Sequence, residues 1–74
     1  DVRVEGAMEI DRLNELFPWR LPAGDYETIA GLLIEKFRRI PDKGETLALP
    51  GLVIEVIDAT DRAIEAVRIT KRKK

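Results

Sequence analysis

The 74-residue chain has room for one small domain, which buries only about 60% of the surface that its unfolded form exposes. Hydrophobic residues make up 45% of it and charged residues 36%, with a formal net charge of −1, so the composition is that of a folded protein and excludes a disordered one. The absence of Cys excludes disulfides and thiolate metal sites and is typical of a reducing compartment.

The first two predicted elements are a strand and a short helix. Alternation of valine with charged residues predicts a strand over 2–8, with Gly6 as a bulge or bend. A one-sided apolar stripe predicts a helix over 9–17, which Pro18 ends. Because natural chains rarely begin inside a strand, the opening at Asp1 without an initiator Met is interpreted as the start of a piece of a longer protein.

A linker over 19–24, marked by Pro and Gly, leads to a second and more apolar helix. Either Asp25 or Thr28 caps this helix, which is predicted to run to about Arg39. Its stripe predicts the most buried element of the chain and consists of Ile29, Leu32, Leu33, Phe37 and Ile40. Gly31 costs roughly 0.5–1 kcal/mol relative to Ala, which close packing against a strand or the first helix would explain.

The C-terminal half changes to strand patterns. Short strands are predicted over 45–49, 52–59 and 63–70, and their tight connections predict an antiparallel meander. A change of face at Ile57 predicts a bulge. With the first strand, the pattern predicts an α+β fold: a small antiparallel sheet of about four strands, covered on one face by two helices.

Four segments resemble, in order and spacing, the motifs of one known family. They are G-A-M-E-I-D-R-L-N-E-L at 6–16, L-P followed by D-Y-E-T-I-A-G-L within 21–32, R-I-P-D-K-G-E at 39–45 and G-L-V-I-E-V at 51–56. The chain therefore resembles the transporter-associated domain of the CorC/HlyC family over nearly its whole length, as one domain over 1–74. Met8 and Glu9 depart from the family pattern, which often has a small polar cap and a Pro at the start of the first helix.

The resemblance implies a C-terminal domain behind a pair of CBS domains, in hemolysin-like or magnesium and cobalt efflux proteins, on the cytoplasmic side of the membrane. The family fold is similar to part of the flavin-binding domains of certain oxidases. An accessory, regulatory role through protein–protein contact is the leading hypothesis, and the alternative is a small-ligand-binding module for a flavin, an adenine nucleotide or a divalent cation. The candidate partners are the CBS pair, a membrane domain and a second copy, and no cofactor is expected.

Missing residue types exclude most catalytic chemistry. Without His, Cys, Ser or Gln the chain has no Ser–His or Cys–His nucleophile pair and no imidazole base or metal ligand. The five glycines are scattered singly, so no phosphate-binding loop is present. The family has no catalytic motif to carry over, and we expect no enzymatic activity and no catalytic residue.

Two pairs of residues are candidates for binding. Trp19 and Tyr26 flank the linker and either line a small-molecule groove or protein interface, or close the edge of a thin core. Asp58 and Asp61 bracket a turn, where they either bind a hard cation weakly or only shape the turn. Fold similarity to flavin-binding domains is analogy alone, and the domain offers little volume for an isoalloxazine ring.

The tail over 71–74 is entirely basic and leaves a body with nine basic and fourteen acidic residues. Such a tail is either a solvated terminus or a contact for an anionic membrane surface or acidic partner, at about 1 kcal/mol per basic residue near lipid. No aromatic residue is interleaved with the tail, so nucleic acid is not expected as a partner. Substituting Lys73 is expected to leave stability unchanged.

Overall fold

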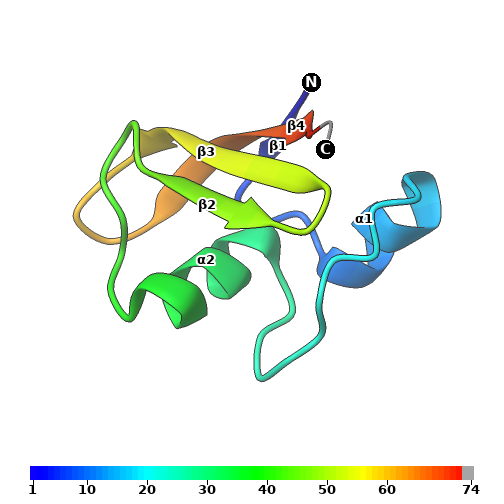
Figure 1. Cartoon of the computed structure of the whole chain (residues 1–74). Helices are drawn as coiled ribbons and strands as arrows, with labels where there is room; N and C mark the ends of the chain where they lie inside the picture. Colours follow the sequence, from blue (N-terminus) through cyan, green and yellow to red (C-terminus); the bar gives the residue numbers. More distant parts are fainter. Residues whose placement is uncertain (73–74) are drawn as a thin grey trace.

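The computed structural model describes residues 1–72, which form a four-stranded antiparallel sheet with two short helices on one face (Figure 1). This confirms the predicted α+β fold. The elements in chain order are β1 (Val2–Glu5), α1 (Ile10–Leu16), α2 (Ile29–Phe37), β2 (Thr46–Leu49), β3 (Leu52–Ala59) and β4 (Ile64–Lys71).

The strands lie in the order β1-β4-β3-β2, so β1 and β2 are the two free edges. The last three strands form the predicted meander, and β1 pairs antiparallel with β4. Between β3 and β4 the register passes from Val56 opposite Val67 to Asp58 opposite Ala66. Ile57 is therefore left without a partner, which confirms the predicted bulge.

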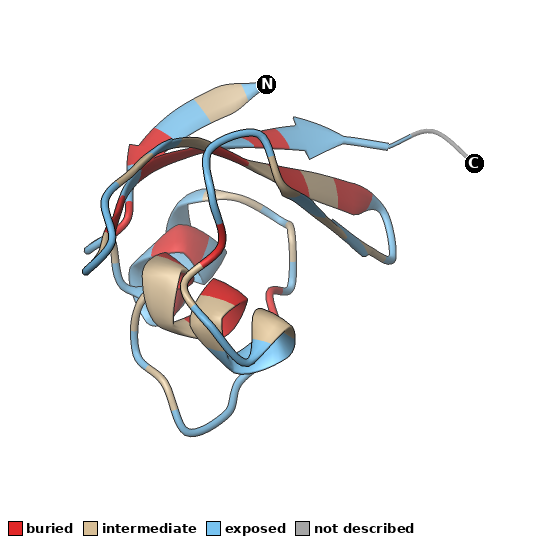
Figure 2. Cartoon of the chain, turned by 90° about the vertical axis from the view of Figure 1, so that its left-hand side faces the viewer, coloured by how far each residue is buried: buried red, intermediate tan, exposed pale blue. Residues whose placement is uncertain are grey.

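The core lies between the sheet and the helices, and buried residues alternate with exposed ones along the strands (Figure 2). The second helix contributes three side chains with no exposed surface, which are Ile29, Leu32 and Leu33. Facing them from the sheet are the equally buried Ile54, Val56 and Val67. Burial of each such side chain contributes about 1.5–3 kcal/mol. Packing of α2 against the two central strands, β3 and β4, is therefore a main source of stability.

The first strand is shorter than predicted because the chain turns at Gly6. The Gly6 N–H donates to the Glu65 carbonyl at 2.9 Å, and the Gly6 carbonyl accepts from the Ala30 N–H at 3.0 Å. A side chain at this position would overlap the carbonyl oxygen of Ile64. Gly6 therefore joins β4 to the first turn of α2, and the strand ends at Glu5.

The second helix begins and ends within the predicted range. Thr28 is its N-cap, with Oγ1 accepting from the Gly31 N–H at 3.0 Å, whereas Asp25 lies outside the helix. It ends at Phe37, two residues early, because Arg38 takes the left-handed conformation with φ +62°.

The sequence predicts that Gly31 packs closely against a strand or the first helix. Its close neighbour is instead the linker. A Cβ atom there would lie 2.8 Å from Cβ of Tyr26, in the linker. The glycine thus lets the linker pack against the first turn of α2.

The tail also differs from its predicted bounds. Lys71 is the last residue of β4, and the Arg72 N–H donates to the Gly51 carbonyl at 2.8 Å. Lys73 and Lys74, which complete the predicted tail, lie outside the described residues.

Candidate functional site

The linker between the helices is attached to α1 by one amide side chain. Asn14 accepts from the Leu21 N–H at 2.8 Å and donates to the Leu21 carbonyl at 3.1 Å. Leu21 itself is buried in the core. This pair of hydrogen bonds fixes the linker next to Trp19. The other end of the linker, next to Tyr26, is held where the Glu27 carbonyl accepts from the Ile10 N–H at 2.8 Å.

Trp19 lies beside the tip of the β2–β3 hairpin. Its ring stacks on Phe17 with centroids 4.2 Å apart and planes 10° from parallel. Together with Pro50, Leu52 and Lys71 it lines a hollow of about 310 Å³ at the tip of the β2–β3 hairpin. The side chains that line this hollow are mainly apolar and include one lysine.

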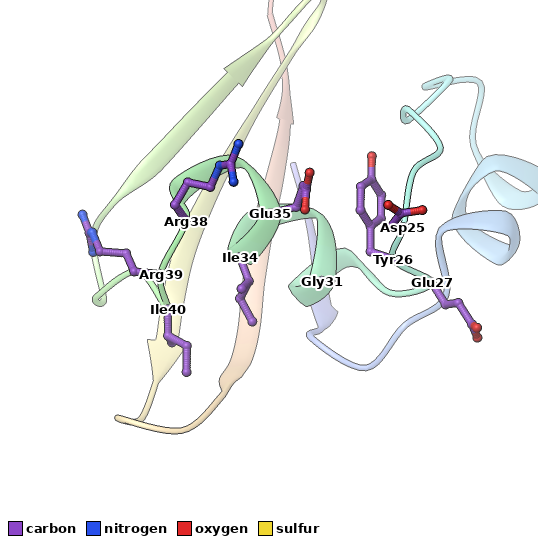
Figure 3. A pocket seen from close by; sticks show the side chains of 9 residues that line it. All are labelled: Asp25, Tyr26, Glu27, Gly31, Ile34, Glu35, Arg38, Arg39 and Ile40. Carbon is purple, nitrogen blue, oxygen red and sulfur yellow. The ribbon is translucent and has the colours of Figure 1, made fainter.

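Tyr26 lines a different hollow, a shallow one of about 580 Å³ between the linker and α2. Figure 3 shows Tyr26 and Asp25 on the linker side, facing Glu35 and Arg38 on the helix side. The Tyr26 hydroxyl donates to the Pro22 carbonyl at 2.9 Å. Partial burial, followed by the charge of Glu35, raises the pKa of Tyr26, so the ring remains a neutral hydrogen-bond donor.

The two aromatic residues therefore do not line one groove. Each packs against the core and also borders a hollow of its own, so they close the edge of the core and leave two separate surfaces. Of the acidic pair, Asp58 lies in β3 and Asp61 in the turn after it, and both are exposed. Within residues 1–72 no group of three or more acidic side chains is arranged to hold a metal ion.

One cluster of charged residues was not predicted from the sequence. Arg39 and Glu45 form a bidentate ion pair across the loop between α2 and β2, with Arg39 Nη1 to Glu45 Oε2 at 2.7 Å. The same carboxylate accepts from the Asp42 N–H at 2.6 Å, and the guanidinium lies 5.6 Å from the centre of the Phe37 ring. The two residues are six positions apart in a loop, so no helix or strand periodicity in the sequence could have indicated the pair.

The hydrogen bond from Arg39, followed by that from Asp42, lowers the pKa of Glu45 to about 2 from an ordinary value of 4.5. A carboxylate with a lowered folded-state pKa stabilises the fold above its unfolded-state pKa, and that contribution is lost as the pH falls toward the folded-state pKa. We expect stability to fall between pH 4.5 and about 2, and Glu45→Gln to lower the melting temperature at pH 7 and flatten this acid limb. Thermal melts across this range test it, with Glu15→Gln, an exposed carboxylate on α1, as the control. An unchanged acid limb in Glu45→Gln would contradict it.

The two hollows are lined by charged, aromatic and apolar side chains, and the sequence supplies no His, Cys or Ser to either of them. Among residues 1–72, no helix has the length and apolar character needed to cross a bilayer.

The profile of the family described as "Transporter associated domain" (CorC_HlyC) matches residues 1–73. A UPF0053 protein of Haemophilus influenzae is 31% identical over 68 residues, and the UPF0053 inner membrane protein YfjD of Escherichia coli is 28% identical over 68 residues. Each match covers 92% of this chain and 16% of the relative. The magnesium and cobalt efflux protein CorC of Buchnera aphidicola is 25% identical over 67 residues, covering 90% of this chain and 23% of that protein.

Solved structures agree with the fold. A hemolysin domain from Enterococcus faecalis superposes with a TM-score of 0.85 at 29% identity, covering 96% of this chain and 87% of that one. A transporter-associated domain from a Xylella fastidiosa hemolysin, in complex with Mg²⁺ and Mn²⁺, gives 0.83 at 28% identity, covering 96% and 86%. The chain thus matches whole single domains, although it spans less than a quarter of its curated relatives.

Proposed function

Because the chain belongs to the CorC_HlyC family of transporter-associated domains, we propose that it is an accessory, regulatory domain of a larger ion-efflux or hemolysin-like protein. In this proposal it modulates transport through contact with other domains and catalyses no reaction. One observation carries the proposal: the family profile matches residues 1–73, whereas the chain spans only 16% of its first two relatives, which supports one domain of a larger protein.

The proposal includes the arrangement in the parent. In it, residues 1–74 are one C-terminal domain behind a CBS pair, on the cytoplasmic side of a membrane-associated protein. The name of the E. coli relative supports the membrane association, and that of the Buchnera relative supports magnesium and cobalt as the transported ions. The proposal assigns the basic residues over 71–74 to contact with an anionic membrane surface or an acidic partner.

Deleting the domain from the parent protein tests the regulatory role. We expect efflux to persist but to lose its normal dependence on intracellular ion concentration, because the transport path lies in another part of the parent. The measurement is magnesium and cobalt efflux from loaded cells, with the amount of parent protein in the membrane quantified alongside.

A matched pair of full-length variants separates regulation from simple loss of protein. Leu33→Asp, which should unfold only this domain, is expected to reproduce the deletion, and Lys36→Asp on the exposed side of the same helix should behave as wild type. Efflux and its ion dependence that stay unchanged after deletion would overturn the proposal. Complete loss of transport would too, because it would make the domain part of the transport path.

A second candidate function, a small-ligand-binding module, is favoured by one comparison. The X. fastidiosa domain was solved with Mg²⁺ and Mn²⁺, and the hollow beside Tyr26 carries the carboxylates of Asp25 and Glu35. Calorimetric or NMR titration with magnesium, cobalt, FAD and adenine nucleotides distinguishes the two functions. Saturable binding that perturbs the amides around Tyr26 would favour this second function over the first.

A further inference from the structure

The two free edges of the sheet differ in how they are protected. The β1 edge carries Arg3 and Glu5, both exposed, and charged side chains are a common means of preventing one sheet edge from pairing with another. The β2 edge reads Thr-Leu-Ala-Leu over 46–49 and has no charge, no proline and no bulge within it. Its shortness is its sole protection.

The backbone groups free on this edge can be identified from the register. The Val56 N–H donates to the Glu45 carbonyl at 2.9 Å, so Glu45 faces β3, and antiparallel strands alternate between bonded and non-bonded pairs. Leu47 and Leu49 therefore also face β3 with their backbone groups. The N–H and C=O of Thr46 and Ala48 point away from the sheet.

The side chains of the edge are equally suited to a partner strand. Thr46 and Ala48 are small and exposed on the outer face, whereas Leu47 and Leu49 are half-buried on the helix side. The one carboxylate next to the strand, Glu45, is paired with Arg39 and leaves little net charge at the edge.

We propose that the β2 edge pairs antiparallel with β2 of a second copy of this domain. The twofold axis is perpendicular to the sheet and passes between the Leu47 residues of the two copies. Thr46 of each copy then lies opposite Ala48 of the other, and all four outward N–H groups find outward carbonyls. Leu47 packs against Leu47 of the other copy, and the helices of both copies lie on the same side of the joined sheet.

The register follows from the same groups. If the axis passed between the two Ala48 residues, Thr46 would lie opposite Pro50, which has no N–H to donate. The Thr46 carbonyl of each copy would then remain unpaired. A one-residue slip would place Thr46 opposite a leucine whose backbone groups already face β3, so the outward groups of Thr46 would have no partner. The pairing about Leu47 gives a partner to every outward N–H and C=O group of Thr46 and Ala48.

Two four-residue strands bury less than the roughly 1,200 Å² of a standard stable interface, so the pairing is weak for free domains. Two domains tethered in one assembly experience effective concentrations of about 1 mM, at which such a contact forms. The partner is thus a second copy held nearby, and the inference does not depend on what the parent transports.

Amide exchange and sedimentation of the isolated domain, from about 50 µM to about 1 mM, test the pairing. We expect exchange of the Thr46 and Ala48 amides to slow by about twofold or more as dimer accumulates by mass action. The Leu47 and Leu49 amides, already bonded to β3, should not change.

Ala48→Lys is expected to abolish both the dimer and the protection. Thr70→Lys places the same charge on the same face, in line with Ala48 across β3 but on an interior strand, and should dimerise as wild type. Ala48→Pro, which removes an outward N–H and no bond to β3, provides a second disruption. A monomer at about 1 mM, protection located elsewhere, or an Ala48→Lys dimer would each overturn the proposal.

Discussion

Leu33→Asp is expected to abolish the cooperative melt of the isolated domain. Leu33 has no exposed surface and belongs to the core cluster between α2 and the sheet. The substitution removes about 1.5–3 kcal/mol of burial. It also leaves a carboxylate without a partner, at a further cost of several kcal/mol. Since a domain of this size has about 3–5 kcal/mol in total, the sum exceeds its stability.

Circular dichroism melts and NMR dispersion measure this effect directly. Lys36→Asp, on the exposed side of the same helix, is the matched control and should cost no more than the roughly 0.3–1 kcal/mol of a misplaced charge near a helix C-terminus. A cooperative melt of Leu33→Asp within a few degrees of wild type would mean that α2 does not face the sheet.

Gly6→Ala is expected to have the second largest effect, although it adds only one methyl group. That methyl would overlap the carbonyl oxygen of Ile64 and approach Cβ of Ala30 to 3.3 Å. Relief requires β4 or α2 to move, which breaks the hydrogen bond that the Gly6 N–H donates to Glu65 or the one that the Gly6 carbonyl accepts from the Ala30 N–H. Overpacking of this kind typically costs about 1–3 kcal/mol, a large share of what the domain has.

Chemical denaturation of Gly6→Ala gives the loss in free energy of unfolding. Ala7→Val, at the next and exposed position, adds volume without meeting the core and serves as the control. A midpoint for Gly6→Ala equal to that of the control would show that the junction of β1, β4 and α2 is looser than the structure describes.

Local patterns predicted those parts of the fold that depend on neighbours in the chain. The stripe of Ile29, Leu32 and Leu33 identified α2 and its buried face, since a helix brings residues three and four apart together. The tight connections predicted the meander, and the change of face at Ile57 predicted the bulge. Linked motifs predicted the family.

Contacts between distant residues were decided only by the tertiary structure. Pairing of β1 with β4, the close approach of Gly6 to Ile64 and the separation of Trp19 from Tyr26 into two hollows all depend on how layers meet. Neither periodicity nor composition carries that information, because each reports a residue's own face and not the partner it meets.

The amino-acid sequence by itself thus determined the fold class, the buried helix and the absence of His, Cys, Ser and Gln side chains. The tertiary structure decided which strands are edges and which backbone groups remain free on them, together with the Arg39–Glu45 ion pair. The physical reason is that hydrophobic periodicity acts between near neighbours, whereas an edge or a loop-closing ion pair exists only once the chain has returned on itself.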